Sequence, residues 1–344
     1  MSFGMEGRMK IVLLCACAAI LLACISVYAA GGRKAAAGAD ESVAYRREMA
    51  GLIGKIKEYG VSRRGSEFFV IANGGAGLME PNELLPEADY GSLLQGLDGV
   101  MAESVNFGWD MEMDKAMPPE EQDNYHRLLD NARRAGVVPL VLDYAREPGN
   151  VQRAYREDRS LGYLGWVSGR RELDRLPEGL PHSDNDLPCP ELKKARNYLV
   201  LLNPEAFASR EAYVQALAAS NYDLLIVDAY YGDSPLTRQE VALLQHKPSG
   251  ARRLVAAYMS VGEAEEYRPY WQEDWKENPP AWLWQRNEAW EGNFRVRYWQ
   301  KDWQDMLMGG PDSYLDIILA GGFDGVFLDV VDVFYSFESL SNGE

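Results

Sequence analysis

Residues 323–332 read FDGVFLDVVD, and this stretch decides the fold. Its apolar residues surround Asp329 and end at Asp332, which is typical of a strand buried on both faces that delivers carboxylates where it leaves a sheet. For any single acid of this kind, a structural Asp that caps the next helix is the alternative. The pattern recurs in segments that carry Glu103, Asp143, Asp228 and Glu263. Acids at the ends of several parallel strands are how an α/β barrel builds a site at one mouth.

Eight predicted strands alternate with helical segments along the chain. The strands begin near Phe68, Asp98, Val137, Gly162, Asn197, Tyr222, Arg253 and Phe323. Helical spacing fits residues 42–59, 118–135, 151–159, 209–220, 237–245 and 313–320. This alternation predicts a single (β/α)8 TIM barrel over residues 42–344. A doubly wound open sheet is the alternative, although no glycine fingerprint for a dinucleotide follows any strand. Residues 170–194, rich in Pro, Asp and Glu, are predicted to form a long surface connection.

The net charge of −17 argues against nucleic acid or an anionic membrane surface as the main partner. It suits a neutral or cationic ligand, and it also serves solubility. The three histidines, His126, His182 and His246, have no ligand-type spacing, so neither a His-based metal site nor a Ser-His-Asp triad is indicated. Carboxylate chemistry is left as the leading option, and no cofactor is predicted.

Residues 1–30 are predicted to be an export signal, because Arg8 and Lys10 precede an apolar run that ends at Ile25. The run from Leu21 to Cys24 resembles a bacterial lipobox, in which Cys24 would be lipidated. An ordinary cleavage site after Ala29 and an uncleaved anchor are the alternatives. The expected protein is periplasmic, attached to the cell surface through that lipid, or secreted.

Residues 31–41 are small and are predicted to be a tether. The folded part beyond it keeps a single cysteine, Cys189, so it cannot form an internal disulfide. Its stability must therefore come from the hydrophobic core.

Seven of the nine tryptophans fall between Trp271 and Trp303. One interpretation is a local core for a long insertion. The other is an aromatic cleft for sugar rings, whose C–H faces stack on aromatic side chains. We expect both uses to occur.

Two opposed carboxylates are enough for glycoside hydrolysis, because one donates a proton and the other attacks or activates water. The predicted mouth supplies such pairs from Glu103, Asp143, Asp228, Glu263, Asp329 and Asp332. The same oxygen ligands suit a divalent cation, so a metal-dependent hydrolase is an alternative.

Four segments resemble a known family. They are YDLLIVDAYYGD (222–233), AAYMSVGEAEEYRPYW (256–271), NPPAWLWQRNEAWEGNFRVRYWQKDWQ (278–304) and SYLDIILAGGFDGVFLDVVDVF (313–334). Together they resemble the bacterial and archaeal branch of glycoside hydrolase family 114, the endo-α-1,4-polygalactosaminidase-like TIM-barrel proteins. The segments IANGGAGLM (71–79) and LDGVMAESVNFG (97–108) resemble strands that follow LDVVD in the family but precede it here. The resemblance therefore implies a circularly permuted barrel.

The resemblance also implies roles for individual residues. Asp329 would be the nucleophile or charge-stabilising carboxylate, and Glu103 the acid/base. The sugar-binding candidates are Asp228, Tyr230, Glu263, Asp332, Asn73 and Tyr258. Asp143 is a further candidate, because it lies at the end of a predicted strand. The implied activity is an exported glycoside hydrolase that cleaves an α-linked, galactosamine-type polysaccharide. A non-catalytic carbohydrate-binding surface lipoprotein is the alternative.

Overall fold

The computed structural model describes residues 43–341. The predicted export signal, Cys24 and the tether to residue 41 lie outside the described residues. Eight parallel strands form the central sheet: β1 (Phe69–Asn73), β2 (Gly99–Glu103), β3 (Val138–Tyr144), β4 (Leu164–Ser168), β5 (Tyr198–Leu201), β6 (Leu224–Val227), β9 (Leu254–Ser260) and β13 (Gly325–Asp329). All eight predicted strands are thus confirmed, and the fold is the expected TIM barrel.

The strands follow one another around the barrel in the order β4-β3-β2-β1-β13-β9-β6-β5. Strands β4 and β5 contact each other at the ends of this ladder, so the barrel is nearly closed. Side chains cross this seam: the Tyr198 hydroxyl of β5 donates to the Val141 carbonyl of β3 at 2.6 Å, and its ring packs against Trp166 of β4.

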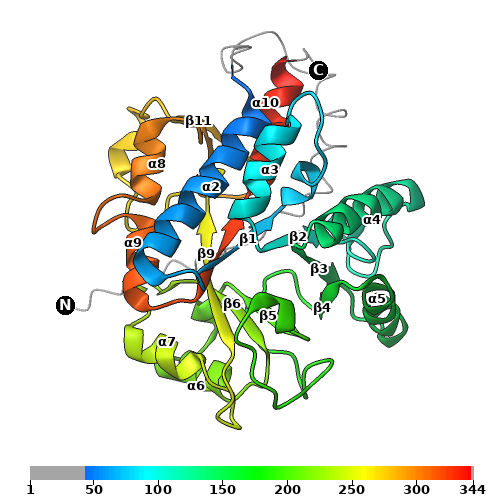
Figure 1. Ribbon diagram of the computed structural model, residues 1–344. Helices are drawn as coiled ribbons and strands as arrows, with labels where there is room; N and C mark the ends of the chain where they lie inside the picture. The colour runs from blue at the N-terminus through cyan, green and yellow to red at the C-terminus, as the bar shows by residue number, and fades with distance from the viewer. Residues whose placement is uncertain (1–42, 342–344) are drawn as a thin grey trace, which may run out of the picture.

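Helices surround the barrel (Figure 1). They are α2 (Tyr45–Arg64), α3 (Glu87–Gly96), α4 (Pro119–Arg134), α5 (Pro148–Leu161), α6 (Arg210–Ala218), α7 (Arg238–Leu244), α8 (Lys301–Leu307), α9 (Tyr314–Gly321) and α10 (Phe334–Ser341). Between β4 and β5, residues 169–197 contain only one short 3-10 helix, η3 (Leu192–Lys194). The segment predicted as a surface connection is therefore irregular, and this crossover lacks an α-helix.

The first and last described helices lie side by side. Helix α2 packs against α3, α9 and α10, and its N-terminal end lies at the same end of the molecule as α10 (Figure 1). Arg46 of α2 forms an ion pair with Glu338 of α10 at 2.8 Å. Helix α2 thus occupies the place of a crossover helix between β13 and β1.

The tryptophan-rich insertion after β9 forms a small antiparallel sheet, which the sequence analysis did not predict. Its strands are β10 (Glu263–Glu265), β11 (Leu283–Arg286) and β12 (Asn293–Val296), in the order β10-β12-β11. Trp275, Trp282 and Trp303 are buried in successive ring contacts at 5.0 and 4.9 Å. Part of the cluster is therefore the local core that was expected. Over residues 43–341, no helix has both the length and the apolar character needed to cross a membrane.

Candidate active site

Three neighbouring strands, β13, β1 and β2, bring Asp329, Asn73 and Glu103 together at the carboxyl end of the barrel. The Asn73 Nδ2 group donates to Glu103 Oε1 and to Asp329 Oδ1, at 2.8 Å in both cases. Because one nitrogen contacts both acids, the two acceptor oxygens lie no farther apart than twice that distance. The two acids expected to form a catalytic pair are therefore neighbours, joined by a third predicted site residue.

The pair is buried, and burial controls its protonation. Burial raises the pKa of Glu103 to about 7, although hydrogen bonds from Tyr144 and Asn73 and the charge of Arg171 act in the other direction. The Tyr144 hydroxyl donates to Glu103 Oε2 at 2.6 Å. Burial, and next the charge of Glu103, raise the pKa of Asp329 well above its ordinary range. Two adjacent buried carboxyls share a proton at neutral pH. Since Glu103 has the better donors, the charge in the free protein lies on Glu103 and the proton on Asp329.

Strand β3 ends in Asp143 and Tyr144, whose side chains point to opposite faces of the sheet. Tyr144 faces the mouth and contacts Glu103. Asp143 faces the helices, where its Oδ1 accepts from the backbone N–H groups of Asn106 at 2.8 Å and Phe107 at 3.0 Å. Asp143 therefore anchors the loop after β2 and lies apart from the pair.

A left-handed residue follows each of the three bridged side chains. Gly74, Ser104 and Val330 have φ values of +74°, +60° and +58°. For a residue other than glycine, such a conformation costs on the order of 1–3 kcal/mol and is found most often at functional sites. At Gly74 an added Cβ would lie 2.9 Å from Asp332 Cγ. The carboxyl of Asp332 thus lies against this turn, and its charge helps to raise the pKa of Glu103.

A second acidic group at the mouth is joined by Arg268. Its Nη1 donates to both oxygens of Asp228 at 2.9 Å, and its Nε donates to Glu265 Oε2 at 2.6 Å. The Tyr258 hydroxyl donates to Glu265 Oε1 at 3.0 Å. The backbone N–H of Tyr230 donates to Asp228 at 2.8 Å. Three predicted sugar-binding residues therefore belong to one network, and Tyr258 on β9 lies beside β13, the strand that carries the nucleophile candidate.

Glu263 accepts hydrogen bonds from side chains of the tryptophan-rich insertion. Its two oxygens accept from Asn287 Nδ2 at 2.7 Å and from Asn293 Nδ2 at 2.9 Å. This contact fastens the β11–β12 hairpin to β10. Within residues 43–341, no group of three or more His, Cys, Asp or Glu side chains is arranged to hold a metal ion.

Arg171, from the irregular segment between β4 and β5, lies beside the pair through its contact with Tyr144. Its guanidinium lies 4.1 Å from the centre of the Tyr144 ring and donates to the Gly108 carbonyl. Glu103 and Asp329 are only 1% and 2% exposed. A sugar therefore reaches the pair only if the side chains that bury it move.

Four residues of the site do not stand out from the sequence patterns: Tyr144, Arg171, Glu265 and Arg268. Strand alternation is the signal for Tyr144, because only one of two adjacent residues faces the mouth. Glu265 and Arg268 stand inside a quoted motif, but nothing in their spacing shows that they pair. Arg171 lies in a segment without periodicity, so only the fold reveals it.

Comparisons with known proteins match the C-terminal part of the chain to one family. Residues 204–343 match the model of glycoside-hydrolase family GH114. An uncharacterized protein of Methanocaldococcus jannaschii is 39% identical over 129 residues, which cover 38% of this chain and 36% of that protein. One from Deinococcus radiodurans is 38% identical over 122 residues, or 35% of this chain and 37% of that protein. One from Thermotoga maritima is 44% identical over 78 residues, or 23% of each.

The matched segments thus span about a third or less of the length of these relatives. The family match covers Asp329 and Asp332 but ends short of the N-terminal strands that carry Asn73 and Glu103. Together with the eight-stranded parallel barrel, it makes the chain similar to GH114 TIM-barrel proteins.

Proposed function

We propose that this GH114-like TIM-barrel protein is a glycoside hydrolase whose catalytic pair is Asp329 and Glu103. The observation that carries the proposal is the Asn73 bridge, which holds both carboxyls within reach of one glycosidic bond. Their shared proton supplies the acid that a leaving oxygen needs, while the ionised partner stabilises or attacks the anomeric carbon.

The short separation supports retention of the anomeric configuration. Retaining enzymes place their carboxyl groups roughly 5–5.5 Å apart, whereas inverting enzymes leave about 6.5–9.5 Å for a water molecule. The Asn73 bridge is compatible with the first range and too short for most of the second. Proton NMR of the first-formed product would give the outcome.

Two observations disagree about which of the two acids is the nucleophile. The resemblance assigns the nucleophile to Asp329, whereas hydrogen bonding in the free protein favours the charge on Glu103. Azide rescue of Asp329→Ala and Glu103→Ala distinguishes them. The variant that lacks the nucleophile forms a glycosyl azide of inverted configuration, and the variant that lacks the acid/base forms one of retained configuration.

The proposed substrate is an α-linked, galactosamine-containing polysaccharide, and the proposed location is outside the cytoplasm. The support is the family resemblance, the net charge of −17, which favours a cationic polymer, and the N-terminal sequence pattern. The test is reducing-end release from a panel of polysaccharides that includes partly deacetylated galactosaminogalactan. Cleavage of that polymer supports the substrate class, and cleavage of another polymer alone would replace it.

The near-complete burial of the pair favours a second candidate, a carbohydrate-binding protein without turnover. This protein would show a change of tryptophan fluorescence with a sugar, because the insertion holds most of the tryptophans, but it would release no reducing ends from any polymer of the panel.

A further inference from the structure

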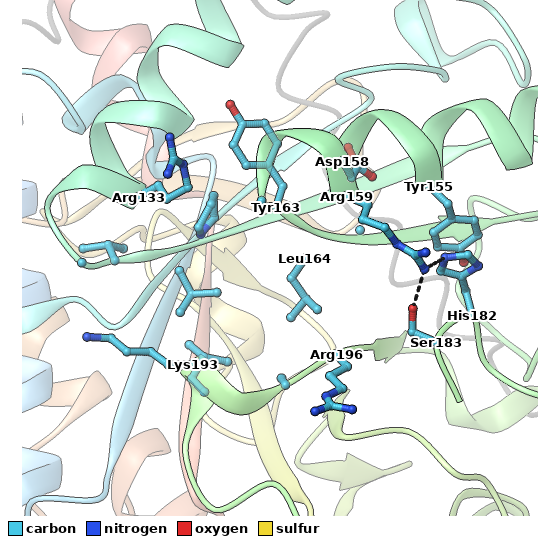
Figure 2. Close-up of a pocket in the computed structure, with 18 residues that line it drawn as sticks. Arg133, Tyr155, Asp158, Arg159, Tyr163, Leu164, His182, Ser183, Lys193 and Arg196 are labelled. Atoms are coloured by element: carbon cyan, nitrogen blue, oxygen red, sulfur yellow. Dashed lines mark hydrogen bonds between the residues drawn. The ribbon is translucent and has the colours of Figure 1, made fainter. Parts of the chain in front are cut away.

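A pocket of about 490 Å³ opens at the amino ends of β3 and β4, the end of the barrel opposite Asp329 and Glu103. It lies where the crossover between β4 and β5 lacks an α-helix. In Figure 2 the Leu164 side chain lies near the middle of the lining, Tyr163 points to the other side of the strand, and Tyr155 and His182 stack at one side. The two rings are 4.0 Å apart and 12° from parallel. The floor consists of apolar side chains, Leu164 with Val138, Pro139 and Leu192, which is a surface that the face of a sugar ring can cover.

Four cationic side chains line this pocket on a strongly acidic protein: Arg133, Arg159, Lys193 and Arg196. They come from α4, α5 and the segment before β5 (Figure 2). Over residues 43–341, no hydrogen bond or ion pair joins the side chain of Lys193 or Arg196 to another group. Arg133 pairs with Asp130 of its own helix at 3.2 Å, so Lys193 and Arg196 are the cations that an anionic ligand would meet unpaired.

Hydrogen-bonded side chains form one wall of the pocket beside these cations. The Arg159 guanidinium donates to the Ser183 hydroxyl at 3.0 Å and lies 2.9 Å from His182 Nε2. Burial, and next the charge of Arg159, lower the pKa of His182, so the imidazole is neutral and accepts this hydrogen bond. Lys193 Nζ lies close to the turn before β3, where a Cβ added to Gly136 would be 3.7 Å away.

The one carboxyl that lines the pocket, Asp158, would not repel a bound anion, because it is uncharged. Asp158 is 2% exposed and lies against Gly165, where only a glycine leaves it room. Burial, and next the charge of Asp143, raise the pKa of Asp158 well above its ordinary range. Asp158 is therefore protonated at neutral pH, and the lining is positively charged.

We propose that this pocket binds a short acidic saccharide, with sugar rings over the apolar floor and carboxylates against Arg133, Lys193 and Arg196. A bare anion would leave the floor uncovered, and a neutral sugar would leave the cations unpaired. Arginine and lysine beside a carboxylate form the stronger, charge-assisted class of hydrogen bond. The pocket volume lies in the range of small-ligand sites, about 300–1,000 Å³. This site is separate from the barrel mouth and does not depend on the proposed hydrolase activity.

The chain offers a matched pair of variants for the test. Arg133 and Lys193 line the pocket, whereas their neighbours Arg134 and Lys194 do not. The double variants Arg133→Ala/Lys193→Ala and Arg134→Ala/Lys194→Ala remove the same charge from exposed positions, so both should fold and keep the parent melting temperature. Binding of trigalacturonate to each protein is measured by calorimetry at low ionic strength, with maltotriose as the neutral probe.

We expect trigalacturonate to bind the parent and the second double variant with affinities within twofold of each other. The first double variant should bind at least about tenfold more weakly, and maltotriose should not bind detectably. Equal weakening in both variants would mean attraction by overall charge only and would overturn the proposal. Absence of trigalacturonate binding, or equal binding of maltotriose, would overturn it too.

Discussion

At the scale of single residues, Asn73 is the centre of the candidate site. It stands on the strand between the two acids and donates to both, so one amide fixes their separation and favours a shared proton. The left-handed residues that follow Asn73, Glu103 and Asp329 turn the chain away from the strand ends. The mouth is therefore built from three short, similar strand endings.

Removal of Arg171 should shift the pH dependence of activity. Its positive charge lowers the pKa of Glu103, so in Arg171→Ala that pKa rises from about 7. A kcat/KM profile reports this ionisation in the free protein, in its acidic limb if Glu103 is the nucleophile and in its basic limb if Glu103 is the acid/base. We expect the limb that Glu103 controls to move to higher pH. Arg170→Ala is the matched control, because Arg170 pairs with Asp174 at 2.8 Å instead. Identical limbs in both variants would contradict the role given to Arg171.

Ser104→Gly should stabilise the protein. Ser104 is buried at φ +60°, and within residues 43–341 its hydroxyl has no hydrogen-bond partner. Glycine removes the left-handed strain and the unsatisfied hydroxyl, each worth on the order of 1 kcal/mol. The free energy of unfolding in urea should rise by about 1–2 kcal/mol. A fall of that size would show that the hydroxyl is bound in solution.

At the scale of elements, the described chain begins with a helix and ends soon after a strand. Helix α2 fills the crossover position between β13 and β1, although no connection between these strands exists in the described chain. We propose, from the order of the family-like motifs along the chain, that the barrel is circularly permuted relative to the family.

A relinked chain tests this proposal at the level of folding. A short linker joins residue 341 to residue 43, and new ends are opened between Gly179 and Leu180 in the irregular β4–β5 connection. Because α2 and α10 already pack together through Arg46 and Glu338, the relinked protein should fold with a melting temperature within a few degrees of the parent. Failure to fold would show that the present ends are needed where they are.

The sequence predicted the elements better than the contacts between them. All eight strands follow from apolar runs, because a strand buried on both faces leaves that pattern, and five of these runs lead into an acid. The β10–β12 sheet was missed because its strands are short and its tryptophans resemble a ligand cleft. Asp143 and Glu263 share the strand-end pattern of Asp329, but the first points to the helices and the second to Asn287. Only the fold decides which acids meet.

At the scale of the whole molecule, buried acids should make stability fall as pH rises. The pKa values of Glu103, Asp329 and Asp158 are raised by burial, so the folded protein binds more protons than the unfolded chain above about pH 4.5. Their stabilising contribution is complete below the unfolded pKa values and is lost as pH rises through the folded ones. Glu240 acts oppositely, because Arg210 lowers its pKa to about 2. The stability maximum should therefore lie near pH 5.

Thermal unfolding from pH 5 to pH 8 measures this effect. Each unit of pKa shift corresponds to about 1.4 kcal/mol, so Glu103 alone should lower the free energy of unfolding by about 3 kcal/mol by pH 8. The melting temperature should fall by several degrees, and Glu103→Gln should reduce the slope. A melting temperature that is constant or rises across this range would be inconsistent with a protonated buried pair.

The most direct test of the central claim compares three carboxyl-to-amide variants for reducing-end release from the polysaccharide that the parent cleaves. Asp329→Asn and Glu103→Gln should lose at least about 10³-fold in rate, because each removes one half of the pair. Asp143→Asn, on the other face of the sheet, should stay within about threefold. Circular dichroism must show all three folded. If either Asp329→Asn or Glu103→Gln is folded and keeps the parent rate, these two residues are not the catalytic pair.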